Sequence, residues 1–110
     1  MGDMVAELSY GVMIRKEDFN RIWDLFYSPK GVEKKNKLTH YLGLRNPYET
    51  DDYIIYMQVS LRTAYNGTKA LHDTFHIDYD VWDDEITPFL EEHKIKPLTE
   101  PNWLLTARFG

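Results

Sequence analysis

The sequence contains no cysteine, which excludes disulfide bridges, thiolate nucleophiles, zinc ribbons and iron–sulfur centres together. It also lacks any apolar run near the ~18 residues of a membrane span, and its N-terminus lacks the charged and then apolar pattern of a signal peptide. We therefore expect a cytoplasmic protein that has no membrane partner. The six glycines are scattered singly and form no phosphate-binding loop, so we expect no nucleotide or other cofactor.

The 110 residues correspond to one α+β domain, 1–110, and 43% of them are apolar, which is enough for one hydrophobic core. Residues 1–3 precede a second methionine, Met4, and a cloning remnant is one interpretation of them. The formal net charge of −5 disfavours a protein that coats nucleic acid through bulk positive charge. We therefore expect no direct contact with nucleic acid.

Hydrophobic periodicity in the first half of the chain predicts a strand, a helix and a third element that is either a strand or a helical turn. Alternation of period two over residues 5–14 predicts a strand that is buried on one face. A helix follows and ends before Pro29, and its inward stripe is expected to contain Phe19, Ile22, Trp23 and Phe26. Residues 30–52 fit either a short strand or a helical turn, and the turn at Asn46-Pro47 favours the strand.

In the second half, two alternating stretches predict a hairpin over residues 53–78 that turns at Asn66-Gly67. A second helix is expected to begin near Asp83 or Asp84, with Pro88 in its first turn, and a last strand is expected over 103–109. The order β-α-(β)-β-β-α-β predicts two helices on one face of a four- or five-stranded, mainly antiparallel sheet, ferredoxin-like or related to it. This fold hosts enzymes, RNA binders and regulators, so it does not decide function.

Charge is distributed very unevenly along the chain. Residues 30–45 carry a net charge of +4 from five basic residues and one acid, whereas residues 73–92 carry eight acids and no lysine or arginine. Helix capping and first-turn positions explain half of these acids, and the other half has no such role. An acidic surface suits a basic partner. We therefore predict the following partner-binding residues: Asp73, Asp78, Asp80, Asp83, Asp84, Glu85, Glu91 and Glu92.

The leading hypothesis is a non-catalytic binding protein, an inhibitor or regulator of a basic protein partner. In one version the partner itself binds nucleic acid, and the chain is a nucleic-acid mimic of the phage or mobile-element type whose carboxylates take the place of phosphates. This version rests on an analogy with small acidic inhibitors in general and not on a resemblance to a particular family. In another alternative the basic segment 30–45 pairs with the acidic surface of a second copy and forms a homodimer.

Two other functions remain open. His72, His76 and Asp78 are candidate ligands for a metal-binding protein or a small metal-dependent hydrolase, although a strand spreads the two histidine Cα atoms by ~13 Å. The solvated face of a strand is the plainer explanation of these residues. A ferredoxin-like regulatory module that binds a ligand on the helix-free face of its sheet is the other alternative. The predicted hairpin also places Ser60 across from His76, an arrangement that many inert pairs share with nucleophilic catalysts.

Overall fold

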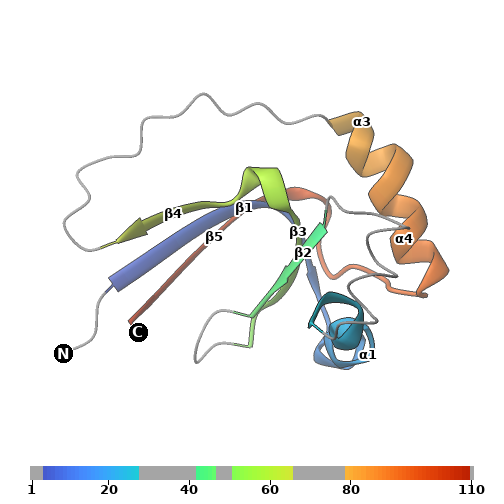
Figure 1. The fold of residues 1–110 in the computed structure, drawn as a ribbon, viewed down its shortest axis with the longest axis horizontal. Coiled ribbons are helices and arrows are strands. Elements are labelled where there is room, and N and C mark those ends of the chain that lie inside the picture. The colour runs from blue at the N-terminus through green and yellow to red at the C-terminus, as the bar shows by residue number, and fades with distance from the viewer. Residues whose placement is uncertain (1–3, 28–41, 47–50, 66–78, 110) are drawn as a thin grey trace.

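The computed structural model describes residues 4–27, 42–46, 51–65 and 79–109. Within them the chain forms a five-stranded antiparallel sheet with two helices, which confirms the predicted α+β class (Figure 1). The strands are β1 (Met4–Ile14), β2 (Leu42–Arg45), β3 (Tyr53–Met57), β4 (Arg62–Tyr65) and β5 (Asn102–Phe109). No helix of these residues is long and apolar enough to cross a membrane.

The first helix, α1, spans Lys16–Tyr27. The second is a continuous helical stretch from Tyr79 to Glu92, made of α3 (Tyr79–Val81), the π-helical turn η2 (Trp82–Ile86) and α4 (Thr87–Glu92). We refer to residues 79–92 as the acidic helix. Figure 1 shows both helices at one end of the sheet, whereas β4 and the adjoining parts of β1 and β5 project away from them.

Strand β1 is central and pairs with three other strands. Along one edge it pairs with β5 from Met4 to Gly11. Its other edge is shared, because β4 pairs with residues 5–8 and β3 pairs with residues 11–14. Gly11 pairs with both Tyr56 and Asn102, which places β3 and β5 on opposite edges of β1. Strand β2 then extends the sheet beyond β3.

The predicted long strand that starts at residue 53 is interrupted. Tyr56 pairs with Gly11 and Arg62 pairs with Leu8, so six steps along this segment match three steps along β1. The extra residues form the 3-10 turn η1 (Gln58–Ser60) between β3 and β4. The second half of the predicted hairpin, with its Asn66-Gly67 turn, lies outside the described residues.

The hydroxyl of Ser60 compensates for this interruption. It accepts a 2.8 Å hydrogen bond from the backbone N–H of Tyr10 and donates a 2.6 Å bond to the carbonyl of Met57. Ser60 is fully buried. Both of its hydrogen bonds therefore serve the sheet, and His76, which the predicted hairpin places across from it, lies outside the described residues.

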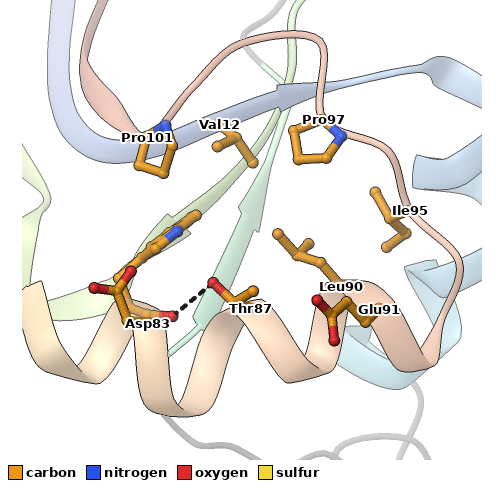
Figure 2. A pocket seen from close by; sticks show the side chains of 9 residues that line it. Val12, Asp83, Thr87, Leu90, Glu91, Ile95, Pro97 and Pro101 are labelled. Atoms are coloured by element: carbon orange, nitrogen blue, oxygen red, sulfur yellow. Dashed lines mark hydrogen bonds between the residues drawn. The ribbon is translucent and has the colours of Figure 1, made fainter.

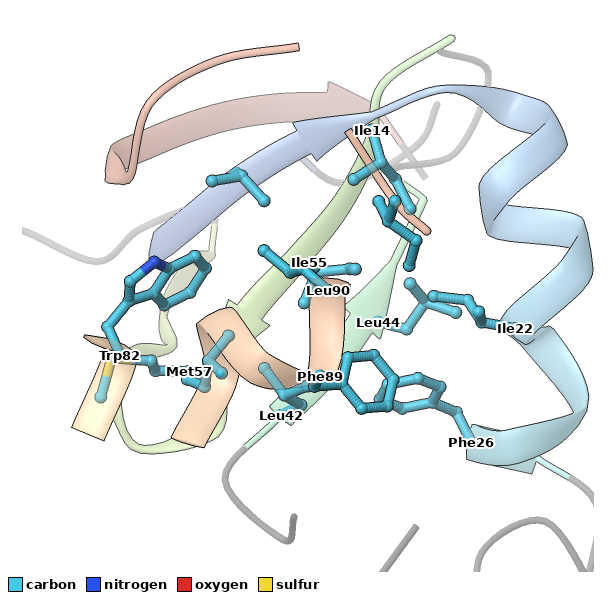
Figure 3. Packing of buried hydrophobic residues seen from close by; sticks show 13 residues of the cluster. Ile14, Ile22, Phe26, Leu42, Leu44, Ile55, Met57, Trp82, Phe89 and Leu90 are labelled. Carbon is cyan, nitrogen blue, oxygen red and sulfur yellow. The ribbon is translucent and has the colours of Figure 1, made fainter. Parts of the chain in front are cut away.

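One hydrophobic core joins both helices to the same face of the sheet (Figure 3). The rings of Phe26 on α1 and Phe89 on the acidic helix meet edge to face, with centroids 6.2 Å apart. Packing of both helices on one face therefore agrees with the prediction from the order of the elements. The buried members of the core are Val12, Ile14, Ile22, Phe26, Leu42, Leu44, Ile55, Met57, Trp82, Ile86, Phe89, Leu90 and Ile95.

The prediction that Trp23 points inward was wrong. Trp23 is 44% exposed and stacks on Tyr27, with ring centroids 4.8 Å apart. Tyr27 in turn donates a 2.6 Å hydrogen bond to the carbonyl of Leu44 on β2. Because Ile22 and Phe26 already fill the inner face of α1, the larger indole covers its flank instead.

The predicted start of the second helix was also wrong. The helix begins at Tyr79 rather than near Asp83, so Pro88 lies well inside it. Proline has no N–H to donate and its ring clashes with the carbonyl four residues earlier. The turn before Pro88 is widened to a π-helix, in which Thr87 N–H bonds the carbonyl of Trp82 five residues back. This widening lets the helix continue through the proline.

Candidate partner-binding site

The acidic helix presents charge to solvent on one side and apolar groups to the core on the other. Trp82, Ile86, Phe89 and Leu90 are buried, and they recur at the spacing of one helix face. The helix contains no lysine or arginine. Its six acidic side chains are all exposed: Asp80, Asp83, Asp84, Glu85, Glu91 and Glu92. The other two predicted partner-binding residues, Asp73 and Asp78, lie outside the described residues.

The C-terminus of the acidic helix turns the chain back over the helix. Lys94 adopts a left-handed conformation with φ of 54°, and its N–H bonds the carbonyl of Glu91. The N–H of Ile95 bonds the carbonyl of Leu90 at 2.8 Å. These two bonds form a Schellman motif, which brings the side chains of Ile95 and Leu90 together. Arg21 on α1 adds a 3.0 Å hydrogen bond to the carbonyl of His93.

The returning segment, residues 95–101, is fixed to the sheet. The N–H of Leu98 bonds the carbonyl of Met13, and the N–H of Met13 bonds the hydroxyl of Thr99 at 3.1 Å. Strand β1 thus holds this segment opposite the acidic helix. Both walls of the space between them are therefore positioned by backbone hydrogen bonds.

A cavity of about 370 Å³ lies between the acidic helix and the returning segment. Figure 2 shows Val12, Pro97 and Pro101 across from the helix, and Asp83 and Glu91 on either side of Thr87. We call this space the acid-lined cavity. Its remaining lining residues are Trp82, Leu90 and Ile95.

An aromatic cluster adjoins the cavity through Trp82. The ring of Tyr10 lies at the centre and makes edge contacts with Tyr79, Trp82 and Trp103, with centroids 5.2 to 5.9 Å apart. Burial raises the pKa of the Tyr10 hydroxyl, and the nearby Tyr79 and Asp83 raise it further. Asp83 therefore borders both the cavity and the aromatic cluster.

The helix-free face of the sheet is covered by its own side chains. Arg45 on β2 is buried, and its guanidinium donates hydrogen bonds to the hydroxyls of Ser9 at 2.8 Å and Thr106 at 2.6 Å and to the carbonyl of Leu104. The guanidinium also lies over the ring of Tyr56, 5.8 Å from its centroid. The prediction that β1 is buried on one face only was wrong, because these side chains also bury Ser9.

The buried position of Arg45 contradicts part of the prediction for the basic segment 30–45. Burial lowers the pKa of its guanidinium, while the negative charges of Glu7 and Asp52 and the hydroxyl of Tyr56 oppose that change. An arginine of this kind remains charged. Because Arg45 is engaged inside the sheet, it is not part of an exposed basic surface. The other basic residues of that segment, Lys30, Lys34, Lys35 and Lys37, lie outside the described residues.

The alternative metal ligands His72, His76 and Asp78 also lie outside the described residues, and the metal hypothesis remains a prediction. The part of the chain that the structure describes holds no group of three histidine, aspartate or glutamate side chains placed to bind a metal ion.

The sequence indicates the acids of this site but not the cavity beside them. The residues that point to the cavity are Lys94 at the end of the helix and the two prolines after it, Pro97 and Pro101. A comparison of the chain with protein-family models, curated proteins and solved structures finds no match in any of the three.

Proposed function

We propose that this chain is a non-catalytic binding protein that engages a basic protein partner through the acidic helix and the acid-lined cavity. The observation that carries the proposal is the cavity itself, since Asp83 and Glu91 place two carboxylates around an otherwise apolar space. Exposed acids alone are common on helix surfaces. A preformed cavity bordered by acids selects for a partner of positive charge.

The placement of the acids on the acidic helix supports a role in binding. Like charges on one helix repel one another and disfavour the compact state. Glu91 and Glu92 lie at the C-terminal end of the helix, where the helix dipole favours cations. Residues that oppose folding in this way are expected where binding requires them.

The partner's basic surface is proposed to be one that otherwise binds nucleic acid, which makes the chain an inhibitor or regulator, and a nucleic-acid mimic in the narrowest version. A rigid helix with six exposed carboxylates supports this version, because spaced negative charges are what such a surface recognises. We propose a cytoplasmic location for the encounter. A fractionation that placed the protein elsewhere in the cell would contradict that part.

The strand pairings support a ferredoxin-like arrangement, which we propose as the finer description of the fold. If β3 and β4 count as one interrupted strand, the described elements follow the order β-α-β-β-α-β, and β2 and β5 form the two outer strands. An experimental structure with β4 and β5 on the same edge of β1 would contradict it.

The test is affinity capture with the full chain, followed by a binding measurement with each purified protein it retains. We expect a basic partner whose affinity falls about tenfold when ionic strength is raised well above the physiological level, because salt screens exposed charges. Two variants make the test specific to the site. The first neutralises Asp83, Asp84 and Glu91, and the second neutralises three exposed acids elsewhere, Glu17, Asp51 and Glu100.

The first variant is expected to lose the partner and the second to retain it. Both variants change the net charge equally, so a difference between them reports the site and not the overall charge. Equal retention by both variants would contradict the proposal. Self-association of the purified chain in sedimentation, lost in the first variant, would instead favour the homodimer alternative.

A further inference from the structure

We propose that the acid-lined cavity receives one basic side chain, an arginine or a lysine, from the protein partner. The inference rests on the proposed function and names the group that anchors the partner. A volume of about 370 Å³ lies near the lower end of the ~300–1,000 Å³ found for small-ligand sites. Such a space suits one long side chain rather than a partner helix.

The interior of the cavity matches the hydrocarbon part of such a side chain. Val12 lines the cavity and is fully buried, and Leu90 and Ile95 are each 5% exposed. Pro97 and Pro101 complete the apolar wall across from the helix (Figure 2). Lysine and arginine bury their methylene chains against surfaces of this kind while the charged end stays near water or an acid.

The charged groups of the cavity match the end of the side chain. Asp83, Thr87 and Glu91 of the acidic helix all line the cavity, with one acidic residue on each side of Thr87 (Figure 2). The Thr87 hydroxyl already donates to the carbonyl of Trp82 at 3.2 Å, drawn as a dashed line in Figure 2. A cation is therefore the occupant these groups favour. Lys94 and Lys96 follow the helix, but neither lines the cavity.

Hydrogen bonds within the chain hold both walls of the cavity. The Schellman motif at Lys94 fixes the end of the helix, and the hydrogen bonds of Met13 fix the returning segment. Binding to a preformed cavity avoids the entropy cost of ordering loops. A single inserted side chain is therefore expected to act as the central anchor of the interface.

The test uses the full chain and three small probes that share a four-carbon chain: n-butylguanidinium, n-butylammonium and n-butanol. Methyl NMR signals of Val12, Leu90 and Ile95 report occupancy directly. We expect saturable shifts with one or both cations and at least about tenfold weaker binding of the alcohol, which lacks the charge that the carboxylates select. The stronger of the two cations identifies the residue type of the anchor.

Two variants control for general attraction to an acidic surface. Asp83→Asn with Glu91→Gln removes the cavity's carboxylates, and Asp51→Asn with Glu17→Gln removes two exposed acids outside the acidic helix that do not line the cavity. Loss of cation binding in the first variant alone is expected. Equal loss in both, equal binding of the alcohol, or no saturable shift would overturn the proposal. Cation binding by a chain that captures no basic protein would leave the cavity site standing and refute the proposed function.

Discussion

The guanidinium of Arg45, on the outer strand β2, donates a 2.6 Å hydrogen bond to the hydroxyl of Thr106 on β5, the outer strand at the opposite side of the described sheet. The same guanidinium bonds Ser9 on the central strand β1 through two of its nitrogens. One side chain thereby ties three strands together on the face that the helices leave uncovered. This face is a structural layer of the protein, and the binding site proposed above lies on the other side.

Replacing Arg45 is expected to destabilise the protein through the groups it leaves behind. Arg45→Met leaves the fully buried hydroxyl of Ser9 without the hydrogen bonds that Arg45 donates, at a cost of about 1–3 kcal/mol in the free energy of unfolding. Adding Ser9→Ala removes this hydroxyl, so the double variant is expected to lose less stability than the sum of the two single variants. Urea unfolding of all four proteins measures the coupling. Additivity within ~0.5 kcal/mol would show that the two side chains do not act together.

Two glycines of the sheet are expected to respond differently to alanine. A Cβ on Gly11 would collide with the backbone of β3, lying 2.7 Å from the Cα of Tyr56, and backbone cannot move aside cheaply. A Cβ on Gly43 would meet the far end of the Tyr56 side chain, whose ring covers that glycine. We expect Gly11→Ala to cost about 3 kcal/mol or more and Gly43→Ala about 1–2 kcal/mol in unfolding free energy. The reverse order would contradict the strand register described here.

Asp18 is expected to make stability depend on pH. It is 1% exposed and accepts hydrogen bonds from Arg15 and Arg21. Burial alone would raise the pKa of Asp18, but the hydrogen bonds and charges of the two arginines outweigh it and the pKa falls below its ordinary 3.8. Because the folded pKa is the lower one, this stabilisation is present above pH 3.8 and is lost as pH falls through the folded value.

The variant Asp18→Asn tests this dependence. At pH 7 we expect it to be less stable than the parent chain by about 1–3 kcal/mol, since a buried charge-assisted hydrogen bond is weakened. Thermal unfolding from pH 7 to pH 3 should show the difference narrowing as acid protonates Asp18 in the parent chain. A difference that stayed constant over this range would show that the carboxylate's charge has no part in the stability.

Stability and binding are expected to change in opposite directions at Glu92. It is the last residue of α4, where a negative charge opposes the helix dipole, so Glu92→Gln should raise stability by about 0.5 kcal/mol in unfolding experiments. The same change should weaken binding of the basic partner. Glu100→Gln, an exposed acid outside the helix, is the matched control and should leave partner binding unchanged. A Glu92 variant that is more stable and binds equally well would show that this acid does not serve the interface.

The sequence was sufficient to predict elements whose patterns follow from local backbone geometry. Alternation correctly placed Val12 and Ile14 on the core face of β1, because successive side chains of a strand point to opposite faces. The same alternation left Ser9 on an exposed face. Its burial depends on Arg45, which lies 36 residues later, and no local pattern records a contact over that separation.

The candidate site was predictable in its charges and not in its shape. The uninterrupted acids are visible in the sequence, and those of the described helix are exposed as expected. The cavity depends on two tertiary features, the return of the chain after Lys94 and its attachment to Met13. The sequence does not predict the start of the helix, because a proline is typical of a first helical turn, whereas here a π-helical turn carries the helix through Pro88.

The most direct test of the proposed site is hydrogen–deuterium exchange of the full chain, alone and in complex with the basic partner that it captures. We expect the complex to slow exchange across residues 79–101, which form the acidic helix and the returning segment, with the strongest effect beside the cavity. Exchange on the helix-free side, in β2 and around Arg45, should remain as in the free chain. Protection confined to the outer edge of β5 or to α1, with residues 79–101 unchanged, would contradict the proposed site.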